Sequence, residues 1–121
     1  MNVFSARLGS LLIGLALSSA VMAHAMLDRS TPAVGSSVKA APARVELWFT
    51  EPLEPAFSTV KVVDAAGRQV DARDVVVDRG DRRHLSVSVA SMPPGRYRVA
   101  WRVVSADTHA TEGDFTFDVS P

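Results

Sequence analysis

The chain of 121 residues contains no cysteine. This absence excludes disulfide bonds, zinc–thiolate sites, iron–sulfur clusters, a thiol nucleophile and a blue-copper centre, because each needs a cysteine sulfur. An excess of charge is also missing, since 13 basic side chains balance 13 acidic ones. Proteins that hold nucleic acid by bulk electrostatics carry a basic excess, so we expect no nucleic-acid partner. The length allows one domain rather than two.

Long apolar runs are confined to the start of the chain. Arg7 precedes a compact apolar stretch over residues 8–17, and small residues then fill positions 18–23. This order of basic, apolar and small residues is typical of a cleaved secretory signal peptide. The stretch is short for the roughly 20 residues of a membrane span, and no basic stop follows it. We therefore predict a signal peptide over residues 1–23, export to the periplasm, and a mature domain over residues 24–121 that is not inserted in the membrane.

Apolar and polar residues alternate along most of the mature chain, which is the pattern of half-buried strands. The expected strands are 44–49, 59–62, 75–77, 85–89, 97–103 and 115–119. Turn residues at 64–67 and 92–95 separate some of them, and residues 51–56 could form at most one turn of helix. Several short strands at regular spacing predict an all-β domain, an antiparallel sandwich or barrel.

Asp107 and His109 form the first pair with metal-binding potential. In an extended segment, residues i and i+2 point the same way and lie about 6.6 Å apart. Two ligands that each reach about 2 Å can meet one metal at that spacing. If the odd-numbered residues of strand 97–103 face the core, Asp107 and His109 would face it too. Burial of a lone Asp is costly, so either the strand ends before Asp107 or the pair lines the rim of the sandwich. A local salt bridge or a turn cap is the alternative.

Cleavage after residue 23 would make His24 the N-terminal residue. Its α-amino group has an ordinary pKa of about 7.7–8.0, against about 10.4 for lysine, so a metal displaces its proton more easily. The amine and the ring of His24, the ring of His109 and the carboxylate of Asp107 would provide three nitrogens and one oxygen. This set suits Cu(II) in a tetragonal arrangement, and Zn(II) is the weaker competitor. The alternative is that His24 stands there by accident.

The other candidate residues are less specific. Glu51 follows a strand and is either a hydrogen-bond acceptor or outer ligand beside this site, or a plain surface carboxylate. His84 lies in an arginine-rich segment, where we expect a surface histidine. Only Met26 and Met92 follow residue 23, too few for a thioether cluster that binds Cu(I).

Taken in order, four segments resemble CopC-type periplasmic copper-binding proteins. They are 24–33 (HAMLDRSTPA), 45–54 (VELWFTEPLE), 97–109 (YRVAWRVVSADTH) and 113–117 (GDFTF). The resemblance covers essentially the whole mature chain. It implies a small Greek-key β-barrel or sandwich that is similar to cupredoxins but lacks the thiolate site. It also implies one Cu(II) per chain, with ligands at His24, Asp107 and His109 and with Glu51 nearby.

The chain departs from some members of this family in one respect. Those members carry a methionine-rich loop with a nearby histidine that binds Cu(I), and the corresponding stretch here, residues 71–84, has no methionine. We therefore expect no Cu(I) site. The family implies a carrier or chaperone, not an enzyme, and an inner-membrane copper permease of the CopD type as its partner. We expect a monomer.

Two other functions stay open on the sequence. A copper-dependent mono-oxygenase also uses an N-terminal histidine chelate, although a coordinated Asp107 would occupy the position that oxygen needs. An immunoglobulin-like interaction module with incidental histidines is the other alternative.

Overall fold

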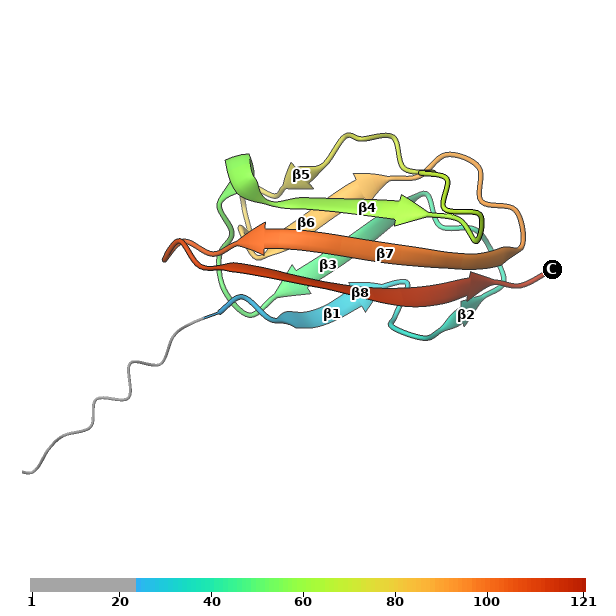
Figure 1. Cartoon of the computed structure of the whole chain (residues 1–121), viewed down its shortest axis with the longest axis horizontal. Coiled ribbons are helices and arrows are strands. Elements are labelled where there is room, and N and C mark those ends of the chain that lie inside the picture. Colours follow the sequence, from blue (N-terminus) through green and yellow to red (C-terminus); the bar gives the residue numbers. More distant parts are fainter. Residues whose placement is uncertain (1–23) are drawn as a thin grey trace, which may run out of the picture.

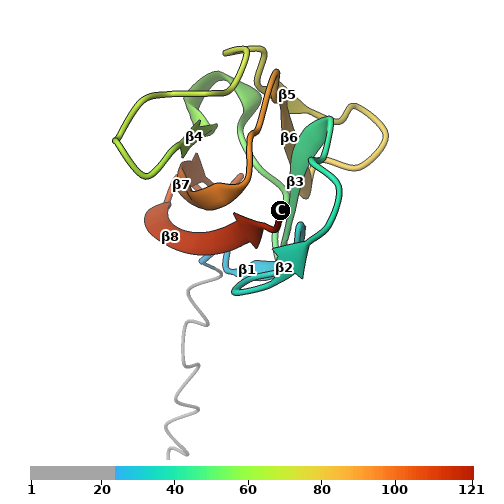
Figure 2. The same ribbon diagram turned by 90° about the vertical axis from the view of Figure 1, so that its right-hand side faces the viewer.

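The computed structural model describes residues 24–121, and residues 1–23, over which we predict the signal peptide, lie outside the described part. Within residues 24–121, eight strands form two sheets that face each other (Figures 1 and 2). The elements are β1 (Leu27–Thr31), β2 (Ser37–Val38), β3 (Arg44–Phe49), the 3-10 helix η1 (Pro55–Phe57), β4 (Thr59–Val63), β5 (Val76–Val77), β6 (His84–Ser88), β7 (Gly95–Val104) and β8 (Ala110–Val119). The fold is therefore a sandwich, which is one of the two all-β architectures predicted from the sequence.

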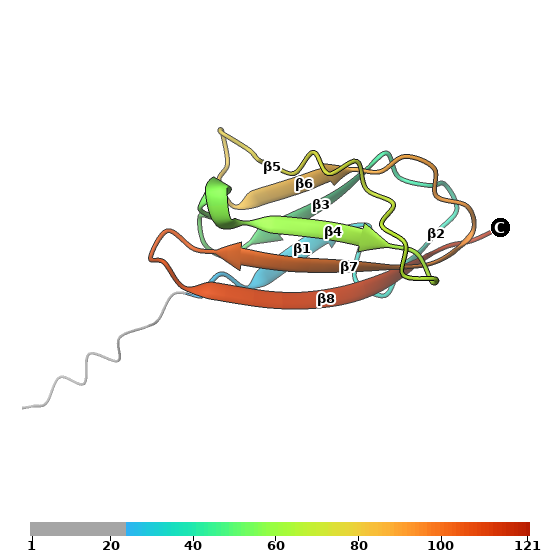
Figure 3. The same cartoon turned by 45° about the horizontal axis from the view of Figure 1, so that its top comes forward.

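One sheet has the strand order β1-β3-β6-β5 and the other β2-β8-β7-β4. Figure 3 shows β4, β7 and β8 as one layer in front of β1, β3 and β6. Neighbouring strands are antiparallel, as predicted, except that the two-residue strand β2 pairs with β8 in parallel. A tight hairpin joins only antiparallel neighbours. Because β2 and β8 are far apart in the chain, no such hairpin constrains their direction.

Alternate residues of the longer strands point into the space between the sheets. Five side chains that are completely buried there are Val45, Leu47, Val62, Val99 and Val103. Burial of a Val or Leu side chain contributes about 1.5–3 kcal/mol relative to exposure. The alternation in the sequence thus corresponds directly to the apolar core.

Trp101 on β7 packs closely against the opposite strand. It lies directly opposite Gly113 of β8, and a Cβ atom at position 113 would overlap the indole ring. The ring also lies 6.0 Å from the ring of Phe49 and 6.2 Å from that of Phe115, between centroids. Position 113 therefore needs glycine for this close approach, and Trp101 links the two sheets.

Six strands were expected from the sequence, and each is present with ends shifted by a few residues, as β3 to β8. The helical turn allowed over residues 51–56 is η1, slightly further along the chain. The strands β1 and β2 were not expected. β1 reads LDRST and shows no alternation of burial, because it is an edge strand held mainly by its pairing with β3.

Within residues 24–121, no helix has the length and the apolar character that a membrane crossing requires. The turn between β7 and β8 lies at the same end of the sandwich as the segment that leads into β1 (Figure 1). This shared end brings the predicted metal ligands near one another.

Candidate metal centre

Asp107 and His109 lie on the tight turn that joins β7 to β8. The strand ends at Val104, and the backbone N–H groups of Ser105 and Thr108 donate to the carbonyls of His109 (3.0 Å) and Ser105 (2.8 Å). Thr108 takes a left-handed conformation with φ 72° to close the turn. The structure thus shows the first of the two expected arrangements: β7 ends before the carboxylate, which avoids burying it in the core, and the i, i+2 spacing of an extended segment does not apply. The turn instead places the Nδ1 atom of His109 3.1 Å from the Oδ2 atom of Asp107.

The carboxylate of Asp107 is held in its ionised form. The hydroxyl of Ser105 donates to its Oδ1 atom, and the backbone N–H of His109 lies 3.3 Å from the same atom. The hydrogen bond from Ser105, followed by the nearby His109 side chain, lowers the pKa of Asp107 below its ordinary value. Metal ligands must be deprotonated, so Asp107 is ready to accept a cation at neutral pH.

Two threonines hold the segment that begins with His24. The hydroxyl of Thr111 on β8 donates to the carbonyl of Ala25 (2.7 Å). Thr50, which follows β3, accepts the backbone N–H of Met26 at its hydroxyl (3.0 Å) and donates its own N–H to the Met26 carbonyl (2.9 Å). These bonds fix the backbone at Ala25 and Met26, just after His24, and they place His24 beside the turn between β7 and β8.

The rings of His24 and His109 meet edge to face. Their centroids are 5.1 Å apart with an interplanar angle of 79°. The Nδ1 atoms of both rings are buried, that of His24 has no hydrogen-bond partner within the described chain, and that of His109 has the Asp107 carboxylate beside it as an ion-pair contact. Buried ring nitrogens without a partner are rare, and the unprotonated nitrogen of a neutral imidazole is a metal ligand.

These distances agree with donors that share one metal ion. Two atoms that are each about 2.0–2.2 Å from a metal and at right angles to each other lie about 3 Å apart, close to the separation of Asp107 Oδ2 and His109 Nδ1. Two imidazoles bound to one metal have centroids about 4.5–6.3 Å apart, from adjacent to opposite positions. The separation between His24 and His109 lies in this interval. The donor set, nitrogens with one carboxylate oxygen, fits Cu(II).

The three side chains nevertheless do not form a complete site by themselves. Within residues 24–121, no three His, Asp or Glu side chains converge into a ready-made metal cluster. The predicted site has a further donor, the α-amino group of His24, which in the uncleaved chain is the amide nitrogen bonded to Ala23. The structure thus places both His24 and Asp107 next to His109. The predicted ligand set still lacks the α-amino group of His24.

Glu51 lies beside this end of the sandwich without a defined side-chain contact. It stands between Thr50, which holds the His24 segment, and Pro52, whose carbonyl accepts the backbone N–H of Ala106 (3.0 Å). Its half-buried side chain forms no hydrogen bond or ion pair with residues 24–121. A role for Glu51 beside the metal stays a prediction.

Three polar residues at the site were not singled out from the sequence. Ser105 stands two positions before Asp107 on the inward parity of β7, and a polar residue on that parity could have indicated it. Thr50 and Thr111 carry no such signal, because their partners lie 24 and 86 positions away in the sequence.

His84 is not the free surface histidine that its sequence context suggests, because its side chain is only 17% exposed. It stacks on Trp48 with centroids 4.6 Å apart, and Arg29 covers Trp48 as well. Its Nε2 atom lies 3.1 Å from Glu46 Oε1, and its Nδ1 atom lies 3.6 Å from Asp78 Oδ2. The Nε2 atom of His84 is already hydrogen-bonded to Glu46, and its ring stacks on Trp48 rather than on another histidine, so the nitrogen donors that Cu(II) prefers do not meet here.

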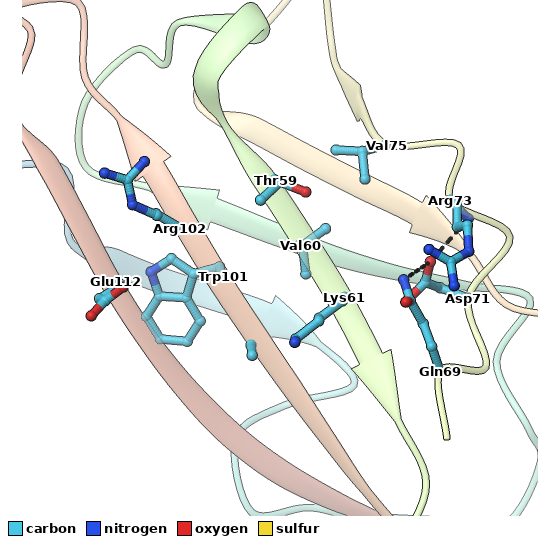
Figure 4. Close-up of a pocket in the computed structure, with 11 residues that line it drawn as sticks. Thr59, Val60, Lys61, Gln69, Asp71, Arg73, Val75, Trp101, Arg102 and Glu112 are labelled. Atoms are coloured by element: carbon cyan, nitrogen blue, oxygen red, sulfur yellow. Dashed lines mark hydrogen bonds between the residues drawn. The ribbon is translucent and has the colours of Figure 1, made fainter. Parts of the chain in front are cut away.

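A groove of about 440 Å³ lies beside β4 and β7 (Figure 4). Lys61, Arg73 and Arg102 line it together with two carboxylates, Asp71 and Glu112. Asp71 is already occupied, since it accepts bonds from the backbone N–H groups of Val62 and Arg73 and from the side chain of Gln69. No histidine lines the groove, so it does not provide the nitrogen donors that Cu(II) prefers.

The chain is similar to copper resistance proteins in sequence and in structure. A sequence profile described as the CopC domain matches residues 27–120. The chain is 39% identical over 112 residues to copper resistance protein C of Pseudomonas syringae pv. tomato, with 88% of each chain covered. Among solved structures, the chain is similar to CopC from Methylosinus trichosporium OB3b, with a TM-score of 0.76 and 32% identity over 81% of this chain and 95% of that one.

A second solved structure is PcoC, described as a methionine-rich copper resistance protein from Escherichia coli. The TM-score is 0.71 and the identity is 36%, over 81% of this chain and 100% of PcoC. These neighbours confirm the all-β, cupredoxin-like sandwich.

Proposed function

This chain belongs to the CopC family of copper resistance proteins, and from that premise we propose that it is a periplasmic carrier that binds one Cu(II) through His24, Asp107 and His109. Copper binding and a role in copper resistance or transport are the properties of the family. The oxidation state, the stoichiometry and the ligands are our proposal.

The observation that supports these ligands best is the pair of buried ring nitrogens at the contact of His24 with His109. The Nδ1 atoms of His24 and His109 belong to rings in edge-to-face contact, and the Oδ2 atom of Asp107 lies beside the second of them. A metal ion between these atoms would satisfy both nitrogens and neutralise the carboxylate. Without a metal, the Nδ1 atom of His24 stays buried without a partner in the described chain, which carries a desolvation cost, and that of His109 has only the Asp107 carboxylate beside it.

The α-amino group would complete the site after cleavage behind Ala23. The Nδ1 atom of His24 is the ring nitrogen that closes a six-membered chelate ring with that amine. The resulting set of three nitrogens and one carboxylate oxygen favours Cu(II) over Zn(II). We therefore propose that residues 1–23 are a signal peptide and that its removal creates the copper site.

We propose that Cu(I) is not a physiological ligand of this chain. Met26 precedes β1 and is 61% exposed, whereas Met92 precedes β7 and is buried. The starts of β1 and β7 lie at opposite ends of the sandwich (Figure 1), so these two thioethers do not meet. Soft thioether ligands are what select Cu(I), and no pair of them is available within residues 24–121.

We also propose that the protein carries copper without catalysing a reaction. A mono-oxygenase needs a free coordination position for oxygen, and Asp107 would fill that position. The proposed partner is an inner-membrane copper permease of the CopD type, to which a monomeric carrier would deliver its ion. Incubation of the copper-loaded protein with a reductant and a polysaccharide tests whether it acts as a mono-oxygenase, and we expect no oxidised product.

The test of the proposed site is a Cu(II) titration of protein that begins at His24, followed by electron paramagnetic resonance. We expect one Cu(II) per chain and a spectrum with coupling to several nitrogens. A stoichiometry well above one, or a spectrum without nitrogen coupling, would contradict the proposed site.

A further inference from the structure

Ser105 is a completely buried polar residue directly beneath the turn that carries Asp107 and His109. Only 1% of it is exposed, and it lies at the end of β7 on the inward parity. Its N–H donates to the His109 carbonyl (3.0 Å), and its carbonyl accepts the N–H of Thr108 (2.8 Å). A further backbone bridge links it to Leu53. The backbone of Ser105 is therefore held on two sides, and its hydroxyl has little freedom.

The single O–H of Ser105 has two acceptors within reach. One is the Oδ1 atom of Asp107, which is the nearer, and the other is the His109 carbonyl at 3.2 Å. A hydroxyl donates one proton at a time, so Asp107 is its main acceptor. This bond occupies Oδ1 and leaves Oδ2 directed toward Nδ1 of His109, at 3.1 Å.

The geometry points to a positioning role for Ser105: we propose that its hydroxyl fixes the rotamer of Asp107 so that Oδ2 is presented to the copper ion. This inference rests on the proposed function, in which Asp107 is a ligand. The Asp107 side chain is 39% exposed on a tight turn, where solvent would otherwise let it rotate away. Partners that orient metal ligands typically account for about 10–100-fold in metal affinity.

Ser58 provides a matched control. It is also a buried serine, 7% exposed, and its hydroxyl bonds to the backbone N–H (3.1 Å) and carbonyl (3.4 Å) of Val104, the residue just before Ser105. It makes no contact with Asp107. Removal of the Ser58 hydroxyl takes away the acceptor of the Val104 N–H, and removal of the Ser105 hydroxyl takes away a donor to Asp107, so both Ser58→Ala and Ser105→Ala are expected to lower thermal stability.

The experiment compares Ser105→Ala, Ser58→Ala, Asp107→Ala and the double variant Ser105→Ala/Asp107→Ala, all beginning at His24. Competition titrations should show that Ser105→Ala weakens Cu(II) binding by about 10-fold or more, while Ser58→Ala leaves it unchanged. In the Asp107→Ala background, Ser105→Ala should cause no further loss, because the group it positions is gone. The copper-free proteins give an independent readout: the carboxyl carbon resonance of Asp107 should move in Ser105→Ala and stay in place in Ser58→Ala.

Equal copper affinities of Ser105→Ala and Ser58→Ala, with Asp107→Ala still weakened, would overturn the positioning role and leave the proposed site intact. An equal loss from Ser105→Ala with and without Asp107 would also overturn it, since Ser105 would then act through the backbone. Wild-type affinity in Asp107→Ala would show that Asp107 is not a ligand, and it would remove both the proposed ligand set and this inference.

Discussion

The Nδ1 atom of His109 lies 3.1 Å from the Oδ2 atom of Asp107. The turn between β7 and β8 holds both side chains at the separation of adjacent ligands on one metal ion. The backbone of this turn is already bonded at Ser105 and Thr108, so copper binding at this pair needs no refolding of the turn. The remaining donors come from His24, which two threonines hold against the same end of the sandwich.

We expect His109→Ala to weaken Cu(II) binding much more than His84→Ala does. The ring of His109 contacts both the ring of His24 and the carboxylate of Asp107, whereas His84 is hydrogen-bonded to Glu46 and stacks on Trp48. The loss of a ligand should exceed the roughly 10–100-fold that the loss of an outer partner costs. Competition titrations measure the affinities, and thermal unfolding of the copper-free proteins checks that both variants fold. Equal losses would mean that His109 has been assigned to the wrong role.

For Cu(I), we expect no tight stoichiometric complex. Met26 precedes β1 and Met92 precedes β7, strands that start at opposite ends of the sandwich (Figure 1), and residues 71–84 include no methionine. Titration against a strong Cu(I) chelator under anaerobic conditions should leave the metal on the chelator. Retention of one Cu(I) per chain that is lost in Met26→Leu or Met92→Leu would refute this expectation.

Gly113→Ala should destabilise the fold. The added methyl group would overlap the indole ring of Trp101, and overpacking of this kind typically costs about 1–3 kcal/mol. For a domain of this size that corresponds to a decrease in Tm of roughly 4–8 °C per kcal/mol. Gly80→Ala is the control, since a Cβ there would make only an ordinary contact, 3.6 Å from Asp78 Oδ1. Equal Tm values for the two variants would contradict the close packing of Trp101.

Asp78→Asn should lower stability near neutral pH and have no effect in strong acid. The backbone N–H of Gly80, followed by the His84 side chain, lowers the pKa of Asp78 below its ordinary value of 3.8. A carboxyl with a lowered pKa in the folded state stabilises the fold above its unfolded pKa, and this contribution is lost as the pH falls through the folded pKa. Urea unfolding of copper-free wild type and Asp78→Asn at pH 7, and at pH values far enough below 3.8 to protonate Asp78 in the folded protein, measures the difference.

The same substitution at Asp28 provides the control for this prediction. Asp28 lies on the edge strand β1, is exposed, and makes no ion pair within residues 24–121. Asp28→Asn should change stability little at either pH. A difference between wild type and Asp78→Asn that persists in acid would show that the amide disturbs the loop in some other way than through the lost charge.

Much of the fold could be predicted because its core strands are buried on one face only. In β3 and β7 the alternation of apolar and polar residues gives both the strand and the side that faces the core. The strand β1 could not be predicted in this way, since its stability comes from pairing with β3 rather than from its own burial pattern. The parallel pairing of β2 with β8 likewise depends on the tertiary arrangement.

The candidate ligands could be identified from the sequence by their chemistry, but their arrangement could not. An N-terminal histidine and an Asp-x-His pair offer the donor types that suit Cu(II). The sequence left open whether the strand ends before Asp107 or the pair lines the rim, and in the structure both residues lie on a turn that begins at Ser105. The residues that hold the site, Thr50 and Thr111, meet the His24 segment only in the folded protein.

We propose that the α-amine that cleavage creates binds Cu(II) together with His24, Asp107 and His109. A change at the N-terminus gives the sharpest test of this proposal. Protein that begins at His24 is compared with protein that carries one alanine before it, by competition titration with Cu(II) at fixed pH. Both proteins keep the two imidazoles and Asp107, but the extension replaces the amine with an amide nitrogen that is reluctant to deprotonate. Stability without copper should be the same for both, because a chain terminus adds little to the core.

We predict that the added alanine weakens Cu(II) binding by at least about 100-fold, or about 2.7 kcal/mol, because it removes one strong nitrogen donor and the chelate ring. The spectrum of the extended protein should show the loss of that nitrogen. If the two proteins bind Cu(II) with affinities within a factor of about two or three, the α-amine is not a ligand and the claim is contradicted.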